Sequence, residues 1–205
     1  MAEGFGELGS LPEAEHRGAV LEALAELAIL VEGWAHRMNL TGHRTAEAVV
    51  RRLILDAAAL DSALPRGIGT LVDVGSGAGF PGLPFAILHP ERKILLVEAR
   101  ERRHHFQRMA IRELRLANVD VWQGRAESLS PSPHDVGIAQ ATAAPSKAAA
   151  LLLPWIRPGG WLLVPGGIHA PNVGPQAGVG SERIVHYRVP LGGPERSLWL
   201  ARKCE

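Results

Sequence analysis

One stretch decides the fold of this chain: Thr70-Leu71-Val72-Asp73-Val74-Gly75-Ser76-Gly77-Ala78-Gly79-Phe80-Pro81-Gly82-Leu83-Pro84. Its first five residues are mostly β-branched or apolar, as in a buried parallel strand. A glycine-rich turn follows, and residues 81–88 are typical of the start of a helix. Glycine has no Cβ and tolerates positive φ, so such a loop lets backbone approach a ligand closely. The helix that follows aims its first N–H groups at the same ligand.

Strands and helices alternate from this stretch onward. We expect strands at residues 70–74, 93–98, 119–122, 136–139 and 160–165, and helices at 81–88, 101–116 and 146–155. This alternation predicts a mostly parallel sheet with helices on both faces. Residues 183–189 and 198–202 predict a C-terminal antiparallel hairpin with its turn at 192–194. Between the sheet and the hairpin, residues 168–182 are rich in Gly and Pro without periodicity, which predicts a mobile loop.

Two helices are expected before the first strand. Ser10 and Glu13 have the spacing of a capping box. Apolar residues then recur at spacings of four and three, which predicts an amphipathic helix: Val20, Leu24, Leu27, Val31, Trp34 and Met38. Residues 46–62 predict a second helix. We therefore expect a helical extension over residues 1–66 and a ligand-binding domain over residues 67–205.

Composition excludes several classes of protein. The chain has 205 residues, a formal net charge of +1 and one cysteine, Cys204. One cysteine cannot make an internal disulfide, and together with the polar first ten residues it favours a cytoplasmic protein. The longest apolar region, residues 141–156, is interrupted by Lys147, so no membrane partner is expected. The nine histidines show no metal-ligand spacing, so no metal is expected.

The glycine loop narrows the choice of ligand. A dinucleotide fingerprint requires G-x-G-x-x-G, but Phe80 stands at the third glycine position, which disfavours a nicotinamide oxidoreductase. The Gly-Lys-Ser/Thr of a P-loop is also missing. Glu98, at the end of the next strand, can accept two ribose hydroxyls. A ligand with a ribose but no pyrophosphate fits, as S-adenosylmethionine does, and Asp73 would lie near its cationic part. The alternative is a tight turn without a ligand.

Residues 73–84 resemble the glycine motif of the RsmG/GidB family, bacterial methyltransferases that modify N7 of one guanine in small-subunit ribosomal RNA. Four further segments are similar to that family: Trp34 with Asn39-Leu40-Thr41, residues 52–56, residues 97–103 and Gly124-Arg125-Ala126-Glu127. The resemblance runs from about residue 34 to residue 167. It implies a class I, Rossmann-like methyltransferase fold with a seven-stranded sheet.

The resemblance also implies site residues. Those expected at S-adenosylmethionine are Asp73, Gly75, Gly77, Gly79, Phe80, Glu98, Ala126, Glu127 and Gln140. Those expected at the substrate are Asn39, Thr41, Arg52, Asp56 and Pro81. The resemblance implies that the partner is RNA of the small ribosomal subunit and that this protein binds it as a monomer. No catalytic base is named, because guanine N7 carries a lone pair and no proton. Simpler explanations remain open: a solvated strand end for Glu98, a surface carboxylate for Glu127 and a helix C-terminal turn for Asn39 and Thr41.

The chain departs from the family pattern on the substrate side. Leu53, Ala57, Gln140 and Pro165 stand where the family usually has His, Ser, Arg and Lys. Two hypotheses follow. The chain methylates the same guanine through other contacts, or it is a diverged protein with another substrate or with cofactor binding alone.

A basic stripe follows Glu98. His105, Arg108, Arg112 and Arg115 share one predicted helix face, opposite Phe106, Ala110 and Leu114. The stripe is either a solvated face or a phosphate contact. Arginines at the start of this helix oppose its dipole, which indicates that helix stability does not explain them. Four tryptophans in apolar runs are expected in the core: Trp122, Trp155, Trp161 and Trp199.

Overall fold

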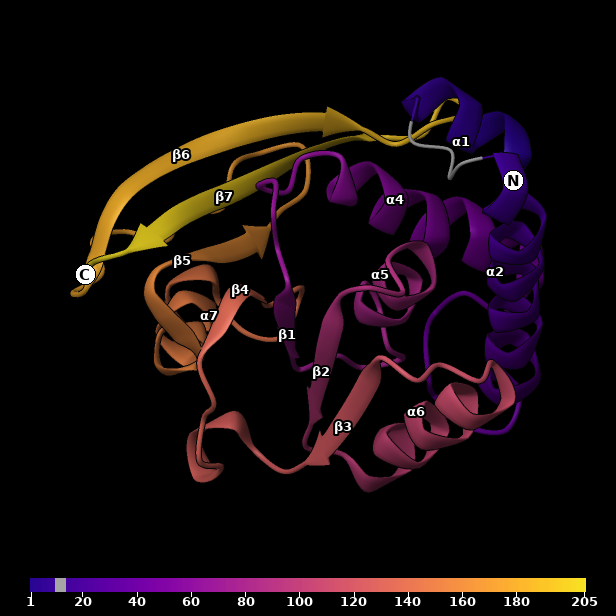
Figure 1. The fold of residues 1–205 in the computed structure, drawn as a ribbon, viewed down its shortest axis with the longest axis horizontal. Helices are drawn as coiled ribbons and strands as arrows, with labels where there is room; N and C mark the ends of the chain where they lie inside the picture. The colour runs from indigo at the N-terminus through magenta and orange to yellow at the C-terminus, as the bar shows by residue number, and fades with distance from the viewer. Residues whose placement is uncertain (10–13) are drawn as a thin grey trace.

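A seven-stranded sheet forms the centre of the computed structural model, which describes residues 1–9 and 14–205. Its strand order is β3-β2-β1-β4-β5-β7-β6 (Figure 1). The first five strands in chain order run parallel, and β7 is antiparallel to both β5 and β6. The strands are β1 (Thr70–Val74), β2 (Lys93–Glu98), β3 (Val119–Gln123), β4 (His134–Ile138), β5 (Ile156–Pro165), β6 (Val179–Arg188) and β7 (Glu195–Lys203).

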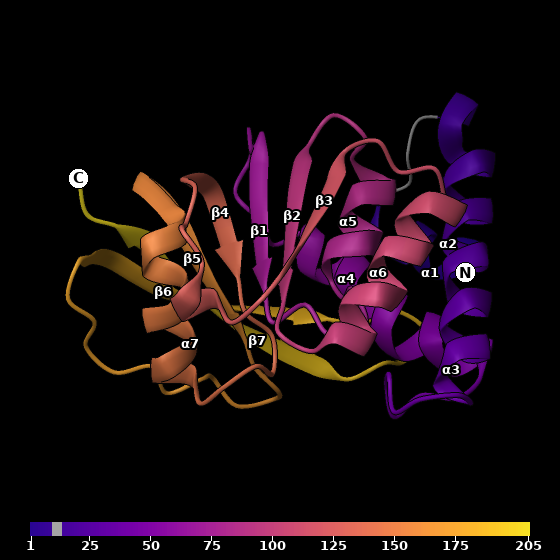
Figure 2. The ribbon, with the colours of Figure 1, turned by 90° about the horizontal axis from the view of Figure 1, so that it is seen from below.

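Helices cover both faces of the sheet. Figure 2 shows α5 (Gly82–Leu88) and α6 (Glu101–Glu113) on one side of the strands, and α7 (Pro145–Leu152) on the other. Side chains alternate accordingly along each strand. Leu71 and Leu96 belong to the core on the α5–α6 side, whereas Val72 and Leu95 belong to the core beneath α7. The expected doubly covered sheet and the terminal hairpin are confirmed.

Four helices precede the first strand: α1 (Ala2–Leu8), α2 (Ala14–Ala35), α3 (Ala46–Val49) and α4 (Leu55–Asp61), with a π-helical turn at Val50–Ile54 between α3 and α4. α2 packs against α5 and α6, whereas α4 packs against α5 and against β6 of the hairpin. Leu24, Leu27 and Leu55 are fully buried in the same cluster as Leu71 of the sheet. The helices before residue 67 therefore share one hydrophobic core with the sheet. No described helix is long and apolar enough to cross a membrane.

Several predicted boundaries were wrong, each for a physical reason. α6 ends at Glu113, because Arg115 has a left-handed φ of 53°. That residue therefore leaves the predicted basic stripe of the helix. β5 begins at Ile156, four residues early, because Ile156 pairs with His134 of β4. β6 begins at Val179, because pairing with β7 overrides the glycines and prolines that predicted a loop. The irregular connection thus spans only residues 166–178.

One of the four tryptophans expected in the core lies at the surface. Trp122 is not a core residue: it lies on the edge strand β3, is 38% exposed and contacts buried Trp155 edge-on.

The sequence did not predict α1, whose two glycines disfavour a helix. Tertiary packing holds it, since Phe5 is buried in the core and a Cβ on Gly4 would lie 2.9 Å from Leu55. The predicted capping box at Ser10 and Glu13 lies outside the described residues.

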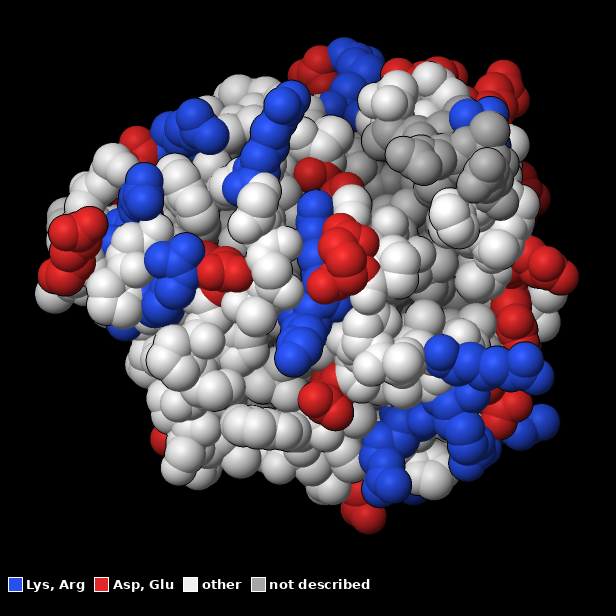
Figure 3. Space-filling model, in the orientation of Figure 1, with Lys and Arg blue, Asp and Glu red and all other residues white. Residues whose placement is uncertain are grey.

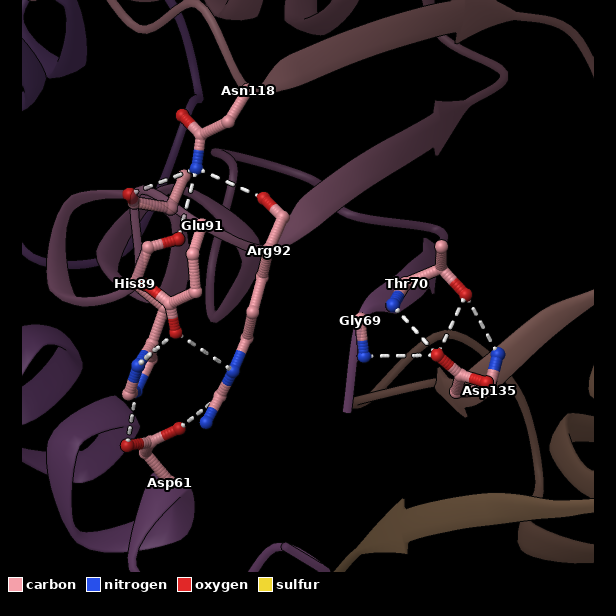
Figure 4. A network of polar contacts seen from close by, with 9 residues as sticks. Asp61, Gly69, Thr70, His89, Glu91, Arg92, Asn118 and Asp135 are labelled. Carbon is pink, nitrogen blue, oxygen red and sulfur yellow. Dashed lines mark hydrogen bonds and ion pairs between the residues drawn. The ribbon is translucent and has the colours of Figure 1, made fainter. Parts of the chain in front are cut away.

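Polar side chains fix the ends of the strands that face away from the glycine loop (Figure 4). The Asn118 amide nitrogen lies 3.0–3.1 Å from the carbonyl oxygens of Ala86, His89 and Arg92, which joins the end of α5 to the start of β3. Asp61 of α4 accepts from Arg92 at 2.8 Å and lies 2.7 Å from the His89 ring. These contacts fasten α4 to the same connection.

A second polar cluster joins β1 to β4. One carboxylate oxygen of Asp135 accepts from the backbone N–H of Gly69 (2.9 Å) and of Thr70 (2.8 Å), and from the Thr70 hydroxyl (3.1 Å; Figure 4). The other oxygen accepts from Arg157 at 2.7 Å. Partial burial alone would raise the pKa of Asp135, but these donors outweigh it and lower the pKa to about 2.

We expect Asp135→Asn to destabilise the fold in a pH-dependent manner. A carboxylate with a lowered folded-state pKa stabilises the fold above its ordinary pKa of 3.8 and loses that contribution as pH falls toward 2. At neutral pH the free energy of unfolding should fall by about 2 kcal/mol. The difference from the native chain should shrink steadily in acid, as measured by urea unfolding at several pH values. The exposed Asp120→Asn is the control and should change stability little; a difference for Asp135→Asn that stays constant in acid would contradict this account.

Candidate functional site

The glycine loop turns sharply at the end of β1. Gly75, Gly77 and Gly79 have φ values of 73°, 59° and 84°, which other residues rarely adopt. The N–H groups of Gly75 and Ser76 both donate to the carbonyl of Val97, at 2.8 and 3.1 Å. The loop is thereby folded against the end of β2, and its glycines are required by the backbone itself.

Glu98 ties this loop to the next helix. One carboxylate oxygen accepts from Gly77 N–H at 2.8 Å, and the other accepts from Arg100 N–H at 2.7 Å, at the start of α6. The side chain is only 4% exposed, so Glu98 is not a solvated strand end. Each oxygen retains a lone pair that a ligand hydroxyl could use.

Gln107 is a loop-supporting residue that the sequence analysis missed. It is fully buried in α6, and its amide nitrogen lies 2.8 Å from the Ser76 hydroxyl and 2.9 Å from the Gly77 carbonyl oxygen. Glu98 and Gln107 therefore hold the N–H and the C=O of the same residue. A signal existed in the sequence: Gln107 is a polar residue on the apolar face of α6, beside Phe106.

Asp73 supports the loop from below. Its carboxylate is 1% exposed and accepts from Gly82 N–H at 3.1 Å, at the start of α5. Burial raises the pKa of Asp73 well above its usual range, the Gly82 bond offsets part of this, and the nearby Glu98 charge raises it further. Its other oxygen has no partner among the described residues. Asp73 does not line the cavity described next, so any contact with the ligand stays a prediction.

A cavity of about 620 Å³ opens beside the loop. Gly75, Glu98, Ala126 and Glu127 line it, so the structure brings together four residues that the sequence singled out. Gly77 borders it through its bond to Glu98. Gly79 and Pro81 are buried within the turn, Phe80 is half-buried, and Gln140 is not among the lining residues.

Residues from distant elements complete the cavity. Thr142, after β4, donates to the Val74 carbonyl at 3.0 Å and packs directly on Gly75, where any Cβ would collide with it. Arg103 places its guanidinium 3.8 Å from the position of a Cβ on Gly77. Lys147 of α7 and Arg125 add positive charge to the wall. No local pattern in the sequence joined these residues to the loop.

The predicted substrate residues separate into two groups. Asn39 lines a smaller hollow of about 280 Å³ together with Arg100 and Arg103, next to the cavity. Thr41 accepts from His43 N–H at 3.2 Å in the turn beyond α2, and Arg52 is exposed in the π-helical turn. Of the predicted substrate residues, only Asn39 therefore lines a hollow that adjoins the cavity.

Asp56 has a different environment. It is buried in α4, and its carboxylate oxygens lie 3.1 Å from Arg196 and 3.3 Å from the Tyr187 hydroxyl, both on the C-terminal hairpin. Burial raises the pKa of Asp56, and Arg196 only partly offsets this. The carboxylate thus fastens the N-terminal helices to the hairpin. A role in substrate binding stays a prediction without geometric support.

The departures from the family pattern have a structural explanation at two positions. Ala57 is 3% exposed in the core, and Leu53 packs against the same core. Apolar side chains therefore stand at these two places because they face other apolar side chains. Pro165 ends β5 opposite Leu198. Nothing in the structure explains Gln140.

The chain is similar in sequence to a known family of proteins. A family model, GidB, described as rRNA small subunit methyltransferase G, matches residues 20–172. A ribosomal RNA small subunit methyltransferase G from Cereibacter sphaeroides is 39% identical over 151 residues, which are 72% of this chain and 73% of that protein. One from Xanthomonas oryzae is 36% identical over 183 residues, 88% of this chain and 85% of that protein.

Solved structures agree on the fold. A SAM-dependent methyltransferase from Aquifex aeolicus superposes with a TM-score of 0.55 at 19% identity, covering 76% of this chain and 93% of that one. An O-methyltransferase from Bacillus cereus, in complex with SAH, gives 0.55 at 16% identity, with 88% and 90% covered. The predicted class I methyltransferase fold is confirmed.

We expect Gly77→Val to abolish binding of S-adenosylmethionine. A branched side chain would project toward Arg103 into the cavity and would strain a backbone with φ of 59°. Isothermal calorimetry measures the loss. Gly67→Val is the matched control, since Gly67 has a φ of 74° with open space around it. It should cost similar strain and leave affinity intact; equal affinity in both variants would argue against the role of the loop.

We expect Gln107→Met to weaken cofactor binding roughly tenfold, since two hydrogen bonds that fix the loop are lost. Methionine keeps the volume of the buried side chain. Gln176→Met is the control, because the Gln176 side chain donates to the Val173 carbonyl at 3.2 Å in a loop that does not line the cavity. A fall in thermal stability for Gln107→Met with unchanged cofactor Kd would show that Gln107 only stabilises the fold.

Proposed function

This chain belongs to the GidB family of rRNA small subunit methyltransferases, and we propose that it uses S-adenosylmethionine to methylate guanine N7 in small-subunit ribosomal RNA. One observation carries the assignment of the site. The Glu98 carboxylate holds the Gly77 N–H at the edge of the cavity that Ala126 and Glu127 also line. We propose further that the protein works as a monomer in the cytoplasm.

The residues of the cavity fit the donor. Gly77 has no side chain to obstruct it, and the atoms nearest a Cβ at that position would be the Arg103 guanidinium at 3.8 Å and the Gly75 carbonyl oxygen at 3.9 Å. Gly75 leaves the room that Thr142 fills. Glu98 would accept the ribose hydroxyls with its remaining lone pairs, and Ala126 and Glu127 would face the adenine. The donor, when bound, supplies a methyl group already activated by its sulfonium.

The protein's part in the chemistry would be positioning. Guanine N7 has a lone pair and no proton, so no general base is needed. Holding N7 in line with the methyl carbon, in near-attack geometry, would supply the rate enhancement. Asn39, Arg100 and Arg103 line the hollow next to the cavity and would orient the guanine there. Their donors could also replace the cations that the family carries at the positions of Gln140 and Pro165.

We expect the purified protein to transfer labelled methyl groups to small-subunit ribosomal RNA, with the label mapping to one guanine N7. Gly77→Val should be inactive, and calorimetry should show binding of S-adenosylmethionine but not of NAD. Cofactor binding without transfer, to RNA or to assembled subunits, would favour the alternative of a diverged cofactor-binding relative. If the label maps to another nucleotide, only the assignment of the methylated nucleotide changes. Tight binding of NAD would overturn the assignment of S-adenosylmethionine as the cofactor.

A further inference from the structure

A second concavity of about 690 Å³ lies between the end of α2 and the first turns of α6. Trp34 and Arg37 line it from α2 and from the turn just after that helix. From α6 come Arg102, His104, His105 and Arg108. The sequence predicted a basic stripe on α6 alone. In the structure the end of α2 lies opposite part of this stripe, and the two together enclose a pocket.

Among the residues that the structure describes, the guanidinium groups of this pocket have no carboxylate partner. Arg37, Arg102 and Arg108 are exposed, and within residues 1–9 and 14–205 none of them has a carboxylate oxygen within 4.0 Å. Arg112, one turn further along α6, contrasts with them, because it pairs with Glu113 at 2.8 Å. Glu101 is the single carboxylate among the described lining residues. Lys and Arg side chains gather over the α6 region, at the lower right of Figure 3. Like charges held this close together favour an anionic ligand.

Aromatic side chains stand beside these charges. The Trp34 ring lies 5.9 Å from the ring of exposed His105, and its other neighbour is Phe106 of the core, at 5.7 Å. Trp34 is half-buried, so part of it stays available to the pocket. Arginines next to aromatic rings are the combination with which proteins hold single-stranded nucleic acid, since the charges meet phosphates and the rings stack on bases.

The pocket adjoins the cavity beside the glycine loop by way of the Asn39 hollow. The Asn39 hollow shares Met38, Glu101 and Arg102 with the pocket, and it shares Arg100 and Arg103 with the cavity. These three adjoining hollows, named the trough, follow one another from the glycine loop, over the start of α6, to the end of α2. A chain whose target base enters at the cavity would follow this trough with its neighbouring nucleotides.

We propose that the pocket between α2 and α6 binds single-stranded RNA that flanks the methylated nucleotide. Arg37, Arg102 and Arg108 contact its phosphates, and a base lies against Trp34 and His105. The proposal rests on the proposed function and assigns a surface for its substrate. A free phosphate would not explain it, because the three arginines and two aromatic rings lie on two walls and exceed what one small anion can contact.

The test is the double variant Arg102→Ala/Arg108→Ala. Its KM for small-subunit ribosomal RNA should rise roughly tenfold at unchanged kcat, because the lost contacts bind substrate and transition state alike. The salt dependence of RNA binding, log Kd against log salt, should flatten by about 1.4, at about 0.7 for each lost phosphate contact to a single strand. The Kd for S-adenosylmethionine should stay as in the native chain.

Arg112→Ala/Arg115→Ala is the matched control. It removes the same charge from the α6 region outside the pocket and should change RNA binding little. Equal loss in both double variants would overturn the pocket in favour of general attraction. If Arg102→Ala/Arg108→Ala binds naked RNA as the native chain does and loses affinity only for assembled subunits, the pocket contacts a ribosomal protein and the RNA proposal is overturned. If the native chain transfers no methyl group to RNA, the proposed function fails; native transfer with unchanged KM in Arg102→Ala/Arg108→Ala refutes the pocket alone.

Discussion

The hydrogen bond between the Glu98 carboxylate and the Gly77 N–H is the constraint on which the site depends. Glu98 ends β2, Gly77 lies in the loop after β1, and the same carboxylate fixes Arg100 at the start of α6. Three elements are thus joined at one buried side chain. A carboxylate that accepts two N–H groups is held in a fixed orientation. Glu98 lines the cavity beside the glycine loop, and Arg100 lines both that cavity and the Asn39 hollow next to the pocket between α2 and α6.

Much of the fold could be predicted because its signals are local. β1 and β2 are short apolar runs buried on both faces, and their bounds in the structure are those predicted from the sequence. Signals failed where tertiary pairing prevails over composition. β6 includes Gly180 because β7 offers it a partner strand, and α1 contains two glycines because the packing of Phe5 holds it. Trp122 is partly exposed because β3 is the edge strand of the sheet, a property of the assembled sheet.

The site was predictable only where its residues follow the strand ends. Gly75 follows β1, Glu98 ends β2, and Ala126 and Glu127 come shortly after β3, so all four lie where the ends of parallel strands meet at one edge of the sheet. Thr142 and Lys147 are brought there by the β4–α7 connection and by α7, which no spacing in the sequence encodes. Gln107 was signalled only by its place on the apolar face of α6. For Asp56 a motif position predicts a place at the substrate, and this stays a prediction; in the structure its carboxylate pairs with Arg196 across the fold.

The cofactor side keeps the family pattern while the substrate side departs from it, and the structure explains how both can hold. The loop, Glu98 and Asp73 form one network of buried hydrogen bonds, in which a single change leaves a buried partner unsatisfied. The arginines of the trough are exposed apart from half-buried Arg103, and among the described residues most lack ion pairs, so adding or losing one costs the fold little. Ala57 and Leu53 pack into the core without disturbing the loop. We therefore propose that arginines at the start of α6 take the place of the cations expected at Gln140 and Pro165, while the donor site stays constant.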